Sequence, residues 1–154
     1  MLNRNTIGNF PLAEYAAKYW ISHFRSLGNE WDDIQRKLVM NLFQPQNNAP
    51  FISWLHLWDI DYPFLPPQWR GTRVKSSAIY YASFAGLLPA VQALIENGAD
   101  VNAQGGKYGN ALQAASCEGH EAIVSMLLEK GVDVNAQGGK YGNALQAALF
   151  RGQM

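Results

Sequence analysis

The chain has 154 residues, of which 48% are hydrophobic, and its 12 Lys plus Arg balance its 12 Asp plus Glu. This length suits one ordinary domain or two small ones, and the balanced charge excludes the basic surplus that nucleic-acid binding needs. No apolar run approaches the length of a membrane span, and the N-terminus lacks the apolar core of a signal peptide. Cys117 is the single cysteine, so no disulfide framework is expected. We therefore expect a soluble cytoplasmic protein that binds neither nucleic acid nor membrane.

The composition changes near residue 70. All five tryptophans precede this point, and twelve of the fourteen glycines follow it. The Pro-rich stretch "DYPFLPPQWRG" lies at the boundary. We predict an all-α protein of two parts: a helical, aromatic-rich module with its Pro-rich connection at residues 1–70, and a second part at residues 71–154.

The first part begins with "PLAEYAAKYWISHFRSL", in which Pro11 suits a first helical position and Gly28 ends the helix. The predicted buried stripe of this helix is Leu12, Ala16, Tyr19, Trp20, His23, Phe24 and Leu27.

A second helix is expected to follow, with Asn29 as its cap and Asp32 and Asp33 as charges in its first turn. Its predicted stripe is Trp31, Ile34, Leu38 and Leu42, and "FISWLHLWD" is the third predicted helix. About 70 residues make a marginal core, so we expect this module to pack on the start of the second part.

The second part contains an exact internal repeat. The sixteen residues "DVNAQGGKYGNALQAA" occupy positions 100–115 and again 133–148, an offset of 33 residues. The same offset aligns Gly86 with Gly119 and Gly152. A period of this length indicates a solenoid, with copies at about 74–100, 101–133 and an incomplete 134–154.

Each complete copy has the signals of two short helices. Asn110 is placed to cap a helix from Ala111 to Glu118, and Gly119 ends it. The segment "HEAIVSMLLEK" predicts the second helix, and Gly131 suits a left-handed position after it. The glycines of "QGGKYG" suit a turn that needs positive φ.

The segment "GNALQAASCEGHEAIVSMLLEKGVDVNAQ" resembles the ankyrin repeat, which implies a stack of helix pairs that binds other proteins. The usual Thr-Pro-Leu-His is replaced here by Asn110-Ala111-Leu112-Gln113, and in the first copy Tyr80 takes the histidine position. A glutamine side chain still has an amide donor for the bonds between repeats.

The phrases "PLAEYAAKYWISHFRS" and "AIYYASFAGLLPAVQALIENGADVNAQGGKYGNALQAAS" are similar to the pre-repeat segment and first repeats of fungal NACHT–ankyrin proteins, which are NLR-like receptors. The resemblance implies the ligand-sensing or scaffold end of such a receptor. Its nucleotide-binding module is not expected here, because Gly106-Lys107 lacks the other residues of a phosphate-binding loop. The alternative is a truncated remnant of a larger gene without a partner of its own.

No enzyme, cofactor or metal site is expected. His23, His56 and His120 are scattered, and a packing role suits His23 while a structural hydrogen bond suits His120. Cys117 has no base beside it in its repeat, and Trp54 with Trp58 most simply form core.

Partner binding is expected on the turn tips and first helices of the repeats. The candidate residues are Tyr81, Phe84, Lys107, Tyr108, Cys117, Glu118, Lys140, Tyr141, Phe150 and Arg151. Tyr81 and Phe84 could instead cover the N-terminal helices. The repeated Lys-Tyr pair is expected at an exposed turn that packing does not require, which favours either a recent duplication or a turn used twice on a partner.

The third copy supplies a helix near Ala144–Phe150 and no second helix to lie across it. Leu145 and Leu149 are therefore expected to be covered on one side only. Such an edge should fray, or associate with further repeats, a partner or a second copy of the chain.

Overall fold

The computed structural model describes residues 11–28, 31–43, 54, 59–64, 66 and 76–152. Within these residues it contains seven helices and no strand, which confirms the predicted all-α repeat fold. The helices are α1 (Pro11–Ser26), α2 (Asp33–Phe43), α4 (Ala78–Phe84), α5 (Leu88–Glu96), α6 (Ala111–Glu118), α7 (Glu121–Glu129) and α8 (Ala144–Gly152).

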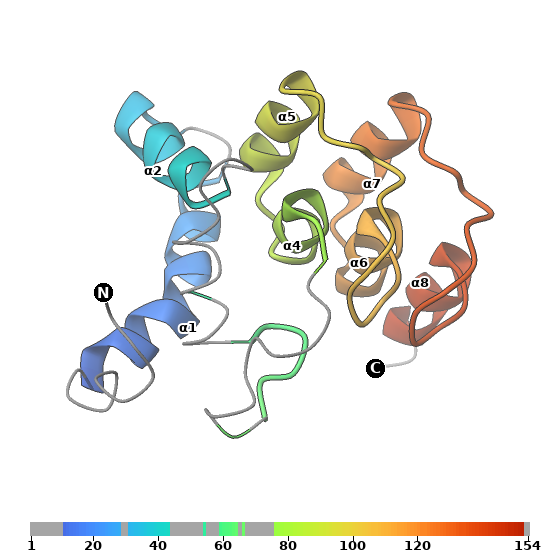
Figure 1. The fold of residues 1–154 in the computed structure, drawn as a ribbon, viewed down its shortest axis with the longest axis horizontal. Coiled ribbons are helices and arrows are strands. Elements are labelled where there is room, and N and C mark those ends of the chain that lie inside the picture. Colours follow the sequence, from blue (N-terminus) through green and yellow to red (C-terminus); the bar gives the residue numbers. More distant parts are fainter. Residues whose placement is uncertain are drawn as a thin grey trace.

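The C-terminal helices form two parallel rows (Figure 1). Helices α4, α6 and α8 lie side by side in one row, and each packs on the next. Helices α5 and α7 form the other row, where each covers the first helix of its own repeat. Each helix pair therefore buries its apolar side against its neighbour, as a solenoid requires.

Local capping sets the helix bounds in the repeats. The side chain of Asn110 accepts a hydrogen bond from the backbone N–H of Gln113 at 2.9 Å, and Ser77 caps α4 in the same way. Gly119 ends α6 in a left-handed conformation with φ of 68°, and Gly131 has φ of 77° after α7. The predicted helix from Ala111 to Glu118 is confirmed at both ends.

The buried side of α1 differs from the predicted stripe. Ala17 and Ile21 are buried and Trp20 and Phe24 are half-buried, whereas Leu12, Tyr19, His23 and Leu27 are exposed. Helix α2 likewise buries Val39 and Phe43 and exposes Ile34 and Leu38. Adjacent apolar residues in both helices allow two stripes about 100° apart, and contact with Trp54 and α5 selects the other one.

Helix α2 begins with a capping box. The carboxylate of Asp32 accepts from the backbone N–H of Gln35 at 2.7 Å, and the side chain of Gln35 accepts from the N–H of Asp32 at 2.9 Å. Asp32 is therefore the cap, and Asn29, which was predicted to cap this helix, lies outside the described residues. So do His56, Trp58 and all of the third predicted helix except Trp54 and Asp59. Trp54 is helical and buried, whereas Asp59 is buried and not helical.

The N-terminal helices pack on the first repeat through aromatic rings. Trp54 makes edge-to-face contacts with Trp20 at 5.6 Å and with Tyr81 of α4 at 6.4 Å, measured between ring centroids. The indole N–H of Trp54 donates to the carbonyl of Ala17 at 2.9 Å. Together with the contact of α2 on α5, these rings cover the side of the first repeat that faces away from α6.

Helices α6 and α8 both begin with the sequence "ALQAA" but lie in different environments. Leu112 in α6 is 3% exposed, whereas its repeat equivalent Leu145 in α8 is 70% exposed. Leu149 is also exposed, and Ala147 is the buried residue of α8. Among the described residues α8 packs mainly on α6, and no helix there lies across it as α7 lies across α6.

We expect α8 to be the least protected repeat helix in hydrogen exchange. The exposed leucines forfeit about 2–3 kcal/mol of burial, so amides of residues 145–150 should exchange at least about 30-fold faster than those of residues 112–117. The shared sequence "ALQAA" makes α6 the internal control. Equal protection of both helices in a monomer would contradict this prediction.

Candidate partner-binding face

A column of aromatic rings runs along the repeats. The ring centroids of Phe84 and Tyr108 are 5.1 Å apart, those of Tyr108 and Tyr141 are 5.7 Å apart, and those of Tyr141 and Phe150 are 4.5 Å apart. The planes of Tyr108 and Tyr141 are inclined by only 17°. The column begins at Phe84 in α4, passes through the tyrosines of the two turns and ends at Phe150 in α8.

The two repeated lysines lie over these rings. The ammonium of Lys107 is 5.2 Å from the ring centroid of Tyr108 and 5.7 Å from that of Tyr62. The ammonium of Lys140 is 4.9 Å from the centroid of Tyr141 and 5.3 Å from that of Phe150. A cation within about 6 Å of a ring centroid contributes about 0.5–1 kcal/mol at an exposed site, so each lysine is favoured beside its ring and keeps its charge. We define the Lys–Tyr face as Phe84, Lys107, Tyr108, Lys140, Tyr141 and Phe150.

The identical turns stack directly on each other. Gly105 donates to the carbonyl of Gly109 at 2.7 Å, and Gly138 donates to that of Gly142 at 2.8 Å, so both turns have the same closure. The backbone N–H of Lys140 then donates to the carbonyl of Lys107 at 2.9 Å. Gly139 has φ of 62°, and a Cβ there would overlap the backbone of Tyr108, so only glycine fits between the turns.

The side chain of Gln113 makes the bond between repeats that was expected from its amide. It donates to the carbonyls of Ala136 at 3.2 Å and Gly142 at 3.1 Å in the following turn. Gln113 is fully buried, so these bonds exclude water and fix the second turn on α6.

The Lys-Tyr pair is therefore part of the packing, which corrects the expectation that packing does not require it. Tyr108 is only 8% exposed, and its ring is enclosed by Phe84 and Tyr141. Tyr141 is half-buried and Lys140 is exposed, so the second copy of the pair is the more accessible. Repetition of the pair has a physical cause, since each tyrosine stacks on the tyrosine of the neighbouring turn.

The buried carboxylate of Asp61 is hydrogen-bonded to the first turn. The hydroxyl of Tyr80 donates to one oxygen of Asp61 at 2.5 Å, and the backbone N–H of Lys107 donates to the other at 3.2 Å. The same hydroxyl accepts from the N–H of Tyr108 at 3.3 Å. Burial raises the pKa of Asp61 and, together with the Asp61 carboxylate, that of Tyr80. The sequence did not predict this contact. It showed only that Tyr80 replaces the usual ankyrin histidine, and it gave no sign that Asp61 would lie beside it.

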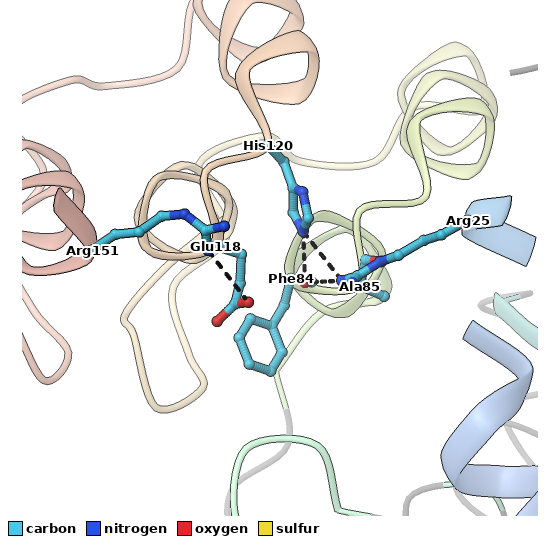
Figure 2. A network of polar contacts seen from close by, with 6 residues as sticks. All are labelled: Arg25, Phe84, Ala85, Glu118, His120 and Arg151. Atoms are coloured by element: carbon cyan, nitrogen blue, oxygen red, sulfur yellow. Dashed lines mark hydrogen bonds and ion pairs between the residues drawn. The ribbon is translucent and has the colours of Figure 1, made fainter. Parts of the chain in front are cut away.

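A row of polar side chains crosses the ends of the first helices (Figure 2). The Nε of Arg25 in α1 donates to the carbonyl of Ala85 at 2.5 Å, and its Nη2 donates to that of Phe84 at 3.3 Å. Arg25 thus satisfies the free carbonyls at the end of α4, where a cation is also favoured by the helix dipole. The N-terminal module is tied to the first repeat by this contact as well as by its rings.

His120 has the structural role predicted for it. Its Nε2 lies 3.2 Å from the carbonyl oxygen of Phe84 and 3.2 Å from Nη2 of Arg25. A neutral ring either donates to the carbonyl or accepts from the guanidinium, whereas a protonated ring would place two cations side by side. Burial and Arg25 lower the pKa of His120 to about 4.

Glu118 and Cys117 complete the inner side of α6. Arg151 of α8 pairs with Glu118 at 4.0 Å, and burial raises the pKa of Glu118 against the influence of Arg151 and Arg25. Cys117 is buried beside Tyr108, and burial raises the pKa of its thiol. A thiol in such surroundings is a packing residue rather than a nucleophile.

The structure brings nine of the ten candidate residues together. Phe84, Lys107, Tyr108, Cys117, Glu118, Lys140, Tyr141, Phe150 and Arg151 follow one another along α4, α6, α8 and the two turns. Tyr81 lies elsewhere, buried against Trp54 in the junction with the N-terminal helices. It therefore takes the alternative role, and Phe84 takes part in the ring column.

Over the part of the chain that the structure describes, no group of three or more His, Cys, Asp or Glu side chains could hold a metal ion. Within the same residues no helix is long and apolar enough to cross a membrane.

Residues 46–153 match the family model for ankyrin repeats in three copies. This match covers more than half of the chain, so the chain belongs to the ankyrin-repeat family. The chain is also similar to azaphilone pigments biosynthesis cluster protein L of Monascus ruber, with 42% identity over 131 residues. The alignment covers 78% of this chain and 27% of that protein, so the chain spans about a quarter of its relative.

Substitution of Tyr80 by Phe tests the buried contact with Asp61. We expect Tyr80→Phe to lower the free energy of unfolding by about 1.5–3 kcal/mol, because a buried carboxylate loses a hydrogen-bond donor. Urea unfolding at pH 7 measures the change. Tyr15→Phe, at an exposed ring of α1, is the matched control and should change little. Equal effects of the two substitutions would contradict the role of Asp61.

His120 should make the fold sensitive to acid. Its folded pKa of about 4 lies below the ordinary value of 6.5, so below pH 6.5 the unfolded chain takes up a proton that the folded chain takes up only near pH 4. Stability is therefore full above pH 6.5 and is lost as the pH falls toward 4. The full shift corresponds to about 3 kcal/mol, which we reduce to about 1–2 kcal/mol because the ring is partly solvated.

The measurement compares unfolding of the wild-type chain and His120→Gln at pH 7 and pH 4.5. The wild-type chain should lose about 1–2 kcal/mol more than the variant over this interval. The raised pKa values of Asp61 and Glu118 act with the opposite sign, but both proteins share them. Parallel losses in the two proteins would show that His120 is not the acid-sensitive group.

Proposed function

We propose that this chain is a protein-interaction module that holds a protein partner on the Lys–Tyr face. Ankyrin repeats are protein-binding modules, and the chain has the fold of that family. The observation that carries the proposal is the gathering of nine predicted residues on one continuous face. Lys140, Tyr141 and Phe150 supply its reachable part, and the exposed Arg151 lies beside it. Tyr108, Phe84 and the neighbouring Cys117 are buried beneath them.

We further propose that the module is the ligand-sensing or scaffold end of a fungal NLR-like protein of the NACHT–ankyrin type. Its similarity to a fungal protein of which the alignment covers 27% supports a place within a larger protein. The N-terminal helices would then join the repeats to the rest of such a receptor, with residues 1–70 and 71–154 as the two parts. We assign the chain no catalytic step and no cofactor.

A second candidate is a remnant of a larger receptor gene that has no partner of its own. The exposed leucines of α8, Leu145 and Leu149, favour it, since they show an apolar surface without cover in this structure. Under this alternative the Lys–Tyr face would only stabilise the stack of turns.

Selection of random displayed peptides on the purified chain tests the proposal. We expect peptides selected on the wild-type chain to bind at least about ten-fold more weakly after Tyr141→Ala with Phe150→Ala, because aromatic side chains dominate such interfaces. The control is Tyr15→Ala with Tyr19→Ala, a ring pair on α1 whose centroids are 4.6 Å apart, against 4.5 Å for Tyr141 and Phe150.

Circular dichroism of both double variants confirms that the helices remain. Peptides that bind both variants alike would place the partner elsewhere on the chain. Failure to select any peptide would favour the remnant.

A further inference from the structure

The Lys–Tyr face carries two ammonium groups that form no close ion pair with a carboxylate of the described residues. Lys107 and Lys140 each lie over aromatic rings, and among the described residues neither ammonium has a carboxylate oxygen within 4 Å. The ion pair beside them joins Arg151 to Glu118 at 4.0 Å. The face therefore presents positive charge, although the chain as a whole has a formal net charge of +0.

The nearest acidic groups are already engaged within the fold. Asp61 is 2% exposed, and its oxygens accept from the hydroxyl of Tyr80 and the backbone N–H of Lys107. Glu118 faces Arg151. Lys107 acts on both carboxylates at longer range and favours their charged forms. Neither carboxylate pairs closely with a lysine, so both ammonium groups can form an ion pair with a partner.

The two lysines lie over neighbouring rings. The tyrosine beneath Lys107 and the tyrosine beneath Lys140 have ring centroids 5.7 Å apart and nearly parallel planes. The hydrogen bond from the N–H of Lys140 to the carbonyl of Lys107 fixes the two turns in this register. In an extended peptide, side chains on one face recur every second residue, about 6.6–7 Å apart.

We propose that the Lys–Tyr face binds an extended acidic protein segment with Asp or Glu at alternate positions, one carboxylate on Lys107 and the next on Lys140. This inference rests on the proposed function and names the chemistry of its partner. Lys107 is half-buried, so an ion pair at Lys107 is screened less by water than one at the exposed Lys140. The ring beside each ammonium restricts the lysine side chain before binding, which lowers the entropy lost in the complex.

A single-stranded nucleic acid fits this face less well than a protein. Tyr108 lies between Phe84 and Tyr141, and Tyr141 lies between Tyr108 and Phe150, so neither tyrosine has a free ring face for a base to stack on. The face also has few cations, whereas nucleic-acid sites commonly neutralise about six to ten phosphates.

Fluorescence anisotropy of labelled peptides with the purified full chain tests the inference at about 50 mM salt, where exposed charges are weakly screened. The probe is an eight-residue peptide of alternating Glu and Thr. The comparison ligands are an eight-residue peptide of alternating Gln and Thr, a block peptide of four Glu followed by four Thr, and an eight-residue oligothymidylate. We expect the alternating acidic peptide to bind most tightly and the Gln-Thr peptide to show no saturable binding.

Lysine substitutions locate the binding. Lys107→Gln with Lys140→Gln should weaken binding of the acidic peptide roughly five- to twenty-fold, as the loss of two ion pairs predicts. Lys37→Gln with Lys130→Gln removes the same charge from exposed positions on α2 and after α7, and should change affinity less than two-fold. Thermal melting of both variants confirms that each remains folded.

Equal binding of the Gln-Thr peptide, equal losses in the two double variants, or tighter binding of the oligothymidylate would each overturn the inference. Equal binding of the block peptide would overturn the alternate spacing. The peptide selection described above separates this failure from that of the proposed function. Selected peptides that depend on Tyr141 and Phe150 but lack alternating acids would leave the proposed function standing and refute this inference.

Discussion

The backbone of the first Lys-Tyr turn is held from two sides, and the arrangement of the repeats depends on this. From one side, Asp61 and Tyr80 accept the N–H groups of Lys107 and Tyr108. From the other side, the carbonyl of Lys107 accepts from Lys140, and Gly139 lies against the backbone of Tyr108. A turn fixed in this way gives the next turn only one register, and the aromatic column follows from that register.

The same contacts join the small N-terminal module to the repeats. An isolated module of this size would bury too little surface to be stable, and here it shares Trp54, Arg25 and Asp61 with the first repeat. A buried carboxylate is costly unless its oxygens are hydrogen-bonded, and Asp61 meets this condition with groups from both the repeat helix and the turn. The module is thus part of the core of the first repeat rather than a separate cover over it.

The Lys-Tyr pair both packs the repeats against each other and places positive charge on the surface. The tyrosines stack between repeats, and the ammonium groups of Lys107 and Lys140 lie 5.2 and 4.9 Å from their ring centroids. Packing and binding are therefore not competing explanations for the repetition of these residues. A solenoid with the same turn in successive repeats places equal charges at a regular spacing along one face, which suits recognition of an extended partner.

The sequence by itself determined the elements that depend on near neighbours. The 33-residue offset, the cap at Asn110, the left-handed glycines at 119 and 131 and the bond-forming capacity of Gln113 could all be predicted, because each acts within a few residues or repeats exactly. The gathering of most candidate residues on one face followed from the same repeat.

Only the tertiary structure decided the buried sides of α1 and α2, the burial of Tyr108 and the role of Asp61. Adjacent apolar residues such as Leu38 and Val39 leave the helix rotation open until a partner surface selects one. Asp61 meets Tyr80 and Lys107 across separations of 19 and 46 residues, and no local pattern encodes such a pairing. A long-range contact is fixed by shape and by the need to satisfy buried polar groups, and both arise only once the elements have packed.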